Sequence, residues 1–553
     1  MIDEINISNF KQIIKADLSL SSINVIVGGN NSGKSCILQG IHFGIMLAQA
    51  RRISGVEQFP AEHLKYCPTD DFLDLHNGRR LTEGSSIVFQ YIKKQSPTND
   101  VTTVTLQRGR NGVVKARSTG GSTLESINDP KGFFSIYVPG LAGITIREEY
   151  RSDAIVSNGI ARGDANLYLR NVLLRIERDQ AKKKAFNSYL NSVFPGVQVH
   201  TNFQEVSDLW IKSVIRRDDA EPRALDMAGT GLLQAIQILA YVSNYNPKIL
   251  LLDEPDAHLH PSNQRLLSHT LDVISKQTDT KIILATHSRH LLDSLSESEA
   301  AKLFWIKSGI ATQQDNWSDI AVLMDLGALD KGEQFLNGSY KYLVWTEDTD
   351  TKPLEVLLVA NGIPSDQTLI FSYQASSKVD AAKLMASFTE RVRPGVITVV
   401  HRDRDFMDDS EVTRLLSKYN LDSQKNIRML ITERSDIEAY FTDPKHLSIA
   451  TGKDEQEVRD LIDDILHDNM VEFVLLFQNK REEIKRDLYK KDPNNCPSPS
   501  SLISGSRVPV EKTVGKKLLK LIRNRLQSER LNGGDIITET MALKREEIAR
   551  IFN

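Results

Sequence analysis

Eight residues near the N-terminus, Gly28–Ser35, have the types and spacing of a phosphate-binding loop. They follow the pattern Gly-x4-Gly-Lys-Ser, in which glycines let backbone N–H groups turn inward around phosphate oxygens. Lys34 would place a positive charge beside the β- and γ-phosphates, and Ser35 would give Mg²⁺ a hydroxyl ligand. The pattern therefore predicts binding of ATP with Mg²⁺, and the residues expected at this site are Gly28, Asn30, Asn31, Ser32, Gly33, Lys34 and Ser35.

A second group of candidate metal ligands lies in the last third of the chain. Glu347 follows the apolar run 342–346, and Asp403 and Asp405 follow the apolar run 396–400. The carboxyl ends of parallel strands meet at one edge of a sheet, where ligand sites are built, so these acids could converge. Carboxylates are preferred ligands of Mg²⁺ and Mn²⁺, and two such ions can activate water for phosphodiester cleavage.

The elements that must position these side chains follow from the hydrophobic pattern. Residues 23–27 are β-branched and apolar and predict a buried strand, and the loop is followed by a predicted helix over 36–53. Further strands of the first domain are predicted within 85–117 and at 135–138, 248–253, 281–285 and 302–306. In the last third, predicted strands at 342–346, 368–372, 396–400 and 427–431 alternate with predicted helices at 354–361, 378–391 and 409–419. This alternation predicts a small parallel α/β domain.

Size, charge and cysteine content limit the class of protein. A chain of 553 residues is too long for one core, and its net charge of −3 indicates that any polyanion site is a local patch. The three cysteines, Cys36, Cys67 and Cys496, have no metal-binding spacing, which favours a reducing, cytoplasmic location. The acidic start has no signal-peptide pattern, and no apolar run approaches the roughly 20 residues of a membrane span, so no membrane partner is expected.

Two stretches carry a resemblance to a known class. INISNFKQI…INVIVGGNNSGKSCIL and LLLDEPDAHLHP resemble ABC-class ATPase heads of the SMC and RecF group, especially defence ATPases with the Asn-Asn-Ser-Gly-Lys-Ser form. The resemblance implies a mixed sheet with an antiparallel β-layer and a helical insertion. It also implies that Asp253 holds Mg²⁺ and that Glu254 polarises the attacking water. His287 looks like the switch histidine that contacts the γ-phosphate.

A glycine turn before a helix suggests the assembly. Gly229-Thr230-Gly231 with Gln234 looks like the signature turn of such heads, which binds the γ-phosphate of ATP held by the other protomer. One chain carries one set of these motifs, so we expect a homodimer or a higher even oligomer. The charged helical stretch 163–195 is far too short for a coiled-coil arm, which disfavours a cohesin-like role.

The acids of the last third resemble a Toprim domain, in which an acid follows the first strand and Asp-x-Asp follows a later one. RSDIEAYF resembles the third acidic segment of Toprim-like domains in OLD-family ATPases, and Glu438 would be its acid. Asp348 stands where the family usually has glycine, which crowds the metal with another carboxylate. Arg402 and Arg404 alternate with the aspartates and could neutralise them, so a degenerate Toprim-like fold held by ion pairs is the alternative.

The predicted organisation has three parts. Residues 1–335 form the ATPase head with a helical insertion at about 150–225, residues 336–445 form the Toprim-like domain, and residues 446–553 form a partly basic helical extension. Two basic stretches have alternative interpretations. The run 175–184 is either a solvated helix face or a nucleic-acid or partner contact. Lys516 and Lys517 could contact phosphates, Lys516 could support the metal site, or both could lie on a solvated helix face.

Three functions are compatible with these patterns. The first is an ATP-gated nuclease that resembles the OLD family, with Mg²⁺ or Mn²⁺ at the Toprim-like site. The second is the ATPase partner of a separate HNH-type nuclease, as in Septu-type defence pairs and their retron-associated versions, which implies a nuclease subunit, a reverse transcriptase complex and nucleic acid as partners. The third is a RecF-like repair ATPase that cuts nothing, which the carboxylates of the last third disfavour.

Overall fold

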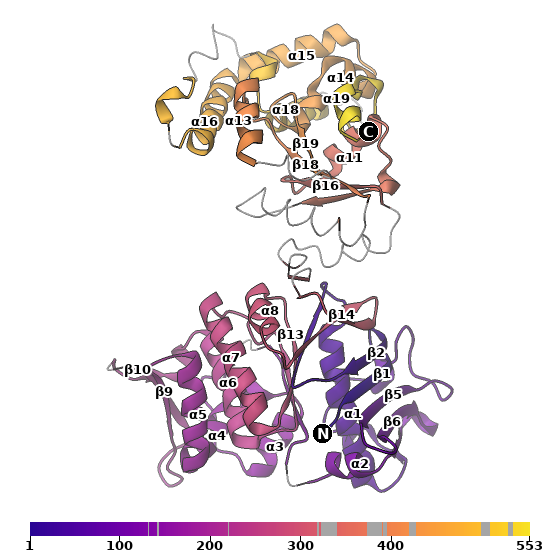
Figure 1. Ribbon diagram of the computed structural model, residues 1–553, viewed down its shortest axis with the longest axis vertical. Coiled ribbons are helices and arrows are strands. Elements are labelled where there is room, and N and C mark those ends of the chain that lie inside the picture. The colour runs from indigo at the N-terminus through magenta and orange to yellow at the C-terminus, as the bar shows by residue number, and fades with distance from the viewer. Residues whose placement is uncertain are drawn as a thin grey trace. The chain divides into compact units, whose positions relative to one another are not determined.

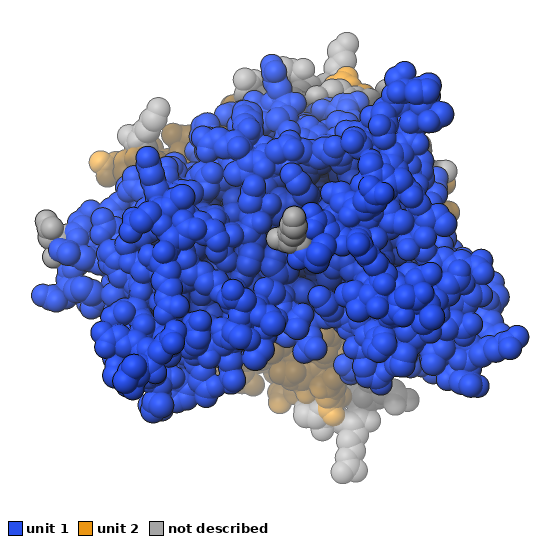
Figure 2. All heavy atoms as spheres, turned by 90° about the horizontal axis from the view of Figure 1, so that it is seen from below, with its two compact units in different colours: residues 1–325 blue, residues 326–553 orange. Residues whose placement is uncertain are grey.

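The structure is a computed structural model of the chain (Figure 1). It describes residues 1–552 except 131, 141–142, 219, 318–319, 322–323, 325–339, 373–389, 391–394, 420–426, 491, 499–508 and 529–534. The chain forms two compact units, Met1–Asp325 and Leu326–Asn553, which Figure 2 colours separately. The predicted end of the head near 330–335 lies outside the described residues, and so does the predicted helix over 378–391 apart from residue 390.

The first unit contains a twelve-stranded mixed sheet of order β4-β7-β6-β5-β1-β2-β15-β14-β3-β13-β12-β8. Strands β14, β3, β13, β12 and β8 run parallel, while β1, β2, β5, β6 and β7 pair antiparallel. This arrangement confirms the expected mixed sheet with an antiparallel layer. The strands are β1 Glu4–Phe10, β2 Ile13–Ser19, β3 Ile23–Gly28, β4 Gln58–Phe59, β5 Ile87–Lys93, β6 Asp100–Arg108, β7 Val114–Thr119, β8 Ser135–Val138, β12 Ile249–Asp253, β13 Lys281–Ala285, β14 Ala301–Lys307 and β15 Ile310–Gln314.

Helix α1 (Lys34–Ser54) is the central helix of this unit and packs on the sheet. It starts after Gly33, whose φ of +106° suits glycine, and most of its residues are buried because both layers of the sheet cover it. Gly44 allows a close approach to β5, since an added Cβ would lie 2.7 Å from the ring of Phe89. The other helices are α2 Ser122–Ile127, α3 Asp153–Ala161, α4 Leu169–Arg178, α5 Gln180–Val193, α6 Thr230–Tyr245, α7 Pro261–Thr278 and α8 Arg289–Ser296.

The segment expected to be a helical insertion contains α3, α4, α5 and a three-stranded antiparallel sheet, made of β9 Val197–Asn202, β10 Lys212–Arg217 and β11 Arg223–Ala224. Its basic run has acidic partners. Arg175 lies 2.7 Å from Asp153, and Lys183 lies 2.6 Å from Glu177. These ion pairs favour the interpretation of the run as a solvated helix face.

The second unit is built on a four-stranded, all-parallel sheet of order β17-β16-β18-β19. This confirms the small parallel α/β domain. Helices of the C-terminal tail share its core, and the ring of Phe552 lies 5.2 Å from that of Tyr342 in the first strand of the sheet. The elements are β16 Tyr342–Thr346, α11 Lys352–Ala360, β17 Thr368–Ser372, β18 Ile397–Arg402, α13 Asp409–Tyr419, β19 Ile427–Ile431, the short 3-10 helix η7 Ile437–Thr442, α14 Pro444–Thr451, α15 Glu455–Asp468, α16 Met470–Leu488, α18 Gly515–Ser528 and α19 Glu546–Phe552.

None of the described helices combines the length and the apolar character that crossing a bilayer requires.

Candidate functional site

The phosphate-binding loop follows the buried strand β3. Its first residue, Gly28, has no room for a side chain, because an added Cβ would lie 2.5 Å from Ser32 Oγ. The Lys34 side chain is 7 % exposed and donates to the carbonyl oxygens of Gly28 at 3.1 Å and of Gly29 at 2.8 Å. The lysine ammonium is therefore held inside the loop, where phosphate oxygens would replace the carbonyls as its partners.

Ser35 and Asp253 meet at the carboxyl edge of the sheet although 218 residues separate them. Ser35 Oγ donates to Asp253 Oδ1 at 3.0 Å, and the Tyr137 hydroxyl donates to Asp253 Oδ2 at 3.0 Å. Burial raises the pKa of Asp253, since water cannot reach its charged form well. One hydroxyl and one carboxylate at this distance are an oxygen donor set that suits Mg²⁺.

Glu254 and His287 follow neighbouring parallel strands, β12 and β13. The backbone of Glu254 has a φ of +49°, and its N–H donates to Ala285 O at 2.9 Å. This turn holds the Glu254 carboxylate 3.8 Å from His287 Nε2, and both side chains are partly exposed. The loop, Asp253, Glu254 and His287 therefore occupy one accessible edge of the sheet.

The residues of the expected signature turn lie at the start of α6. Gly229 is the N-cap and is exposed, while Gln234 is 2 % exposed and lies within the helix. Gly231 packs on the loop that follows Glu254, since an added Cβ would lie 2.6 Å from His258 O. The turn therefore contacts the chain next to the acid pair and presents Gly229 to solvent.

Tyr137 is a residue of this edge that sequence reasoning did not select. It lies on β8, which pairs parallel with β12 in the register Leu251–Tyr137. The sequence predicts this strand but not its pairing with β12, and it is this pairing that brings the Tyr137 phenol to Asp253. An aromatic residue in a short apolar strand carries no other signal of such a role.

The second unit brings three metal-ligating side chains together at the carboxyl edge of its sheet. Asp348, His401 and Asp403 each offer one ligand atom within 4.8 Å of the others. His401 is fully buried, and its Nε2 lies 3.5 Å from Asp403 Oδ1. Asp403 is the one member of this group that the sequence analysis predicts as a metal ligand. Asp348 and His401 are not among the predicted ligands.

The other predicted ligands surround this group. Glu347 Oε1 accepts from the Asp403 N–H at 3.2 Å, Asp405 lies 3.0 Å from Lys480 Nζ, and Glu438 Oε1 lies 3.7 Å from Lys516 Nζ. Burial raises the pKa of Asp405, Glu438 and Asp348.

Asp436 is the most perturbed acid of this edge. Burial, followed by repulsion from Asp403 and Glu438, raises the pKa of Asp436 to about 7. The carboxylates of Asp348, Asp403, Asp436 and Glu438 are buried or half-buried here, and together they form a strongly anionic site.

The arginines of the expected ion pairs have other partners. Arg402 Nη2 lies 3.4 Å from Asp487, and Arg404 pairs with Asp409 and donates to Met407 O. Lys480, which the sequence did not single out, is instead the cation at Asp405. Lys480 and Lys516 therefore lie beside acids of this edge, at Asp405 and Glu438, and the charge of Arg402 also acts on Asp405.

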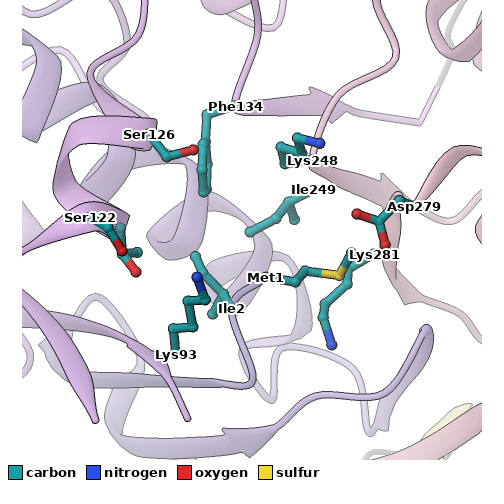
Figure 3. Close-up of a pocket in the computed structure, with 11 residues that line it drawn as sticks. Met1, Ile2, Lys93, Ser122, Ser126, Phe134, Lys248, Ile249, Asp279 and Lys281 are labelled. Carbon is teal, nitrogen blue, oxygen red and sulfur yellow. The ribbon is translucent and has the colours of Figure 1, made fainter. Parts of the chain in front are cut away.

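A separate pocket of about 140 Å³ lies at the opposite edge of the first unit's sheet (Figure 3). Ile249 and Lys281, the first residues of β12 and β13, line it together with Lys93 and Phe134. The phosphate loop and Asp253 lie at the other ends of these parallel strands. The pocket therefore does not belong to the nucleotide site.

Residues 23–293 match the family model described as "AAA domain, putative AbiEii toxin, Type IV TA system". Over these residues the chain is similar to this family of ATPase domains, and the match supports a P-loop ATPase domain that binds ATP with Mg²⁺ in the first unit. None of the curated proteins matches the chain.

Three solved structures are similar to part of the chain. The SMC head bound to the C-terminal winged-helix domain of ScpA is 15 % identical, covers 57 % of this chain and 96 % of its own, and has a TM-score of 0.39. The SMC head domain from Thermotoga maritima is 16 % identical, with 57 % and 98 % covered and a TM-score of 0.33. An SMC head with an extended coiled coil, bound to the C-terminal domain of ScpA from Pyrococcus furiosus, is 14 % identical, with 57 % and 95 % covered and a TM-score of 0.38.

Proposed function

We propose that the chain is an ATPase whose ATP-bound dimer controls metal-dependent cleavage of nucleic acid in a bacterial defence system. The ATPase activity is proposed from one observation, the 3.0 Å hydrogen bond between Ser35 and Asp253. It brings the phosphate-binding loop together with an acid 218 positions further along the chain. The description of the matching family names a toxin of a type IV toxin–antitoxin system, and this supports the defence part.

The chemistry of hydrolysis follows from the edge of the sheet. Lys34 neutralises charge on the β- and γ-phosphates, and Ser35 with Asp253 would hold Mg²⁺, which supplies charge stabilisation for the phosphoryl group. Glu254 would polarise the attacking water. His287, whose Nε2 lies 3.8 Å from the Glu254 carboxylate, would contact the γ-phosphate. The exposed Gly229 and its neighbour Thr230 would complete the site of a second copy, so hydrolysis requires a dimer.

Two substitutions test the ATPase and its dimer. Lys34→Ala removes the charge that neutralises the phosphates, so ATP binding should fall at least a hundredfold in calorimetric titration. Glu254→Gln keeps the fold of the site but cannot polarise water, so it should bind ATP normally and accumulate as an ATP-bound dimer in light scattering. Normal hydrolysis by Glu254→Gln would contradict the assignment of this residue.

The second unit is proposed as the cutting site. Asp348, His401 and Asp403 lie close enough to hold one metal ion, and the surrounding Glu347 and Glu438 add carboxylate oxygens. A bound divalent ion there would supply Lewis-acid activation of water for phosphodiester cleavage. The Asp403 Oδ1 atom is buried and has no hydrogen-bond partner among the described residues, which fits a metal ligand.

Asp403→Ala tests this site directly. It should lower the rate of Mg²⁺- or Mn²⁺-dependent cleavage of nucleic acid at least a hundredfold. The rate of ATP hydrolysis should stay within about twofold of that of the unsubstituted protein, because the two sites lie in separate units. The measurement is nuclease and ATPase activity on the same preparation, with Asp409→Ala, an exposed acid of α13, as the control.

A separate nuclease subunit is the second candidate, because Lys480 holds Asp405 in an ion pair at 3.0 Å and takes that carboxylate out of metal binding. In that case an HNH-type subunit, with or without a reverse transcriptase complex, cuts under control of the ATPase. Cleavage would then require the partner and would survive Asp403→Ala. A neighbouring HNH or reverse transcriptase gene would support this version.

A further inference from the structure

The acidic edge of the second unit contains a histidine that the expected all-carboxylate site lacks. His401 is the fifth residue of β18 and is fully buried. Its Nε2 lies 3.5 Å from Asp403 Oδ1, and its Nδ1 lies 3.9 Å from Asp348 Oδ2. With one ring nitrogen taken as the ligand, the three ligand atoms lie within 4.8 Å of one another, a spacing at which a single ion could contact all three.

We propose that Asp348, His401 and Asp403 together form a site for a divalent first-row transition metal ion, of the Mn²⁺, Co²⁺ and Zn²⁺ class, in preference to Mg²⁺. The inference rests on the proposed metal-dependent role of this edge and adds the kind of metal. Imidazole nitrogen suits transition metals, while Mg²⁺ prefers oxygen ligands and gives up its waters reluctantly.

The hydrogen bonds around His401 orient its ring for this role. Thr346 Oγ1 lies 2.8 Å from His401 Nδ1 and 3.3 Å from Asp348 Oδ2. If Nδ1–H donates to Thr346, the threonine hydroxyl donates onward to Asp348, and the lone pair of the ring lies on Nε2, towards Asp403. A second hydrogen bond of this kind fixes the tautomer of metal-binding histidines in proteins.

The charge of the surroundings points to a cation as well. Asp403 Oδ1 and Glu438 Oε2 are buried and accept no hydrogen bond from the described residues. Glu438 is 8 % exposed, and the charges of Asp348 and Asp403 act on it, so it lies beside the same group. The ion pair of Glu438 with Lys516, a mostly exposed side chain, uses the other oxygen, Oε1. A divalent ion would offset this concentration of negative charge.

The test is metal binding by the whole chain, without nucleotide and after removal of bound metal with a chelator. Titration with MnCl₂, CoCl₂ and MgCl₂ should show one site per chain that binds Mn²⁺ and Co²⁺ at least tenfold more tightly than Mg²⁺. Pulsed electron paramagnetic resonance of the Mn²⁺ form should show coupling to a ¹⁴N nucleus. His401→Asn should remove this coupling and weaken Co²⁺ binding at least tenfold.

A matched control is available in the same unit. His446 is also fully buried and bonds to Thr540 and to Ile536 O, away from the carboxylates, so His446→Asn should keep the ¹⁴N coupling. Asp403→Asn, which is nearly isosteric, should weaken Co²⁺ binding as His401→Asn does. Equal affinity for Mn²⁺ and Mg²⁺, or an unchanged ¹⁴N signal in His401→Asn, would overturn the inference.

The outcomes separate this inference from the proposed function. Metal binding through His401 without any cleavage of nucleic acid would support the metal site and contradict the cutting role. Cleavage that depends on Mg²⁺ and is unaffected by His401→Asn would support the cutting role and contradict the metal site. A folded chain that binds no metal at this edge would contradict both.

Discussion

At the scale of single residues, the nucleotide site depends on hydrogen bonds to one buried carboxylate. Asp253 accepts a hydrogen bond from the Ser35 hydroxyl on Oδ1 and one from the Tyr137 hydroxyl on Oδ2. Two donors on opposite oxygens fix the carboxylate plane, so the lone pairs that would face Mg²⁺ keep one direction. Tyr137 is therefore a positioning residue that acts through Asp253.

Tyr137→Phe removes this hydrogen bond and keeps the ring. Losing one such bond costs about 1 kcal/mol, so kcat for ATP should fall roughly fivefold. The Mg²⁺ concentration needed for half-maximal activity should rise, while ATP binding without metal stays the same. Tyr91→Phe, which loses a bond to Ile41 O in the core, is the control and should leave the Mg²⁺ dependence unchanged. An unaltered Mg²⁺ dependence in Tyr137→Phe would count against the positioning role.

At the scale of elements, α1 connects the nucleotide edge to the insertion through one buried histidine. His42 hydrogen-bonds Ser135 of β8 at 2.8 Å and Ala161 O at the end of α3 at 2.9 Å. Nε2 donates to the carbonyl oxygen of Ala161. Burial lowers the pKa of His42 to about 4, so near neutral pH the ring is neutral and Nδ1 accepts from the serine hydroxyl.

The lowered pKa of His42 predicts how stability depends on pH. The unfolded chain binds a proton at His42 below about pH 6.5 and the folded chain only near pH 4, so stability is complete above pH 6.5 and is lost as the pH falls. The loss is about 1.4 kcal/mol per pH unit and about 3 kcal/mol in total. Calorimetric melting of the first unit between pH 7.5 and 5 measures the first part of this loss, about 2 kcal/mol. His42→Gln should melt lower at pH 7.5 and show a shallower slope, and parallel slopes would contradict the account.

Sequence patterns predict where strands and helices lie along the chain better than they predict which strands pair with each other. Strands that precede polar motifs, such as β3 before Gly28 and β12 before Glu254, are short apolar runs with clear ends, and the structure confirms them. The pairing of β8 with β12 was not predictable, because it joins residues more than a hundred positions apart. His401, for which we propose a ligand role, was not selected from the sequence for a related reason: its neighbours Arg402 and Arg404 suggested ion pairs, and burial cannot be seen in a sequence.

At the scale of the whole molecule, the chain is two units with separate cores. The sequence suggested a Toprim-like domain followed by a helical extension, but the tail supplies part of the core of the sheet. Phe552 and Ile548 of α19 are buried, and Arg428 of β19 donates to Ile551 O at 2.6 Å. Periodicity shows that the tail is helical, but it does not show which surface the helices cover.

Phe552→Ala tests this shared core. Removing a buried phenylalanine costs about 3–5 kcal/mol, so the unfolding transition of the second unit should move to lower temperature. ATP binding should remain, because the nucleotide site lies in the other unit. Calorimetry with nucleotide titration measures both effects, and Met541→Ala, at a side chain that is 80 % exposed, should change neither. Loss of both transitions together would show that the units unfold as one.

The strand order has a mechanical consequence. Strand β14 lies parallel to β3 with Ile306 opposite Gly28, and β15, which pairs with both β14 and β2, is the last described strand of the first unit. A force on the chain beyond β15 would be borne by the ladders of β15 with β14 and β2, and β14 would pass it to the rungs beside the first glycine of the loop. Pulling on the C-terminal end of the first unit would thus load the strand that lies beside the phosphate loop.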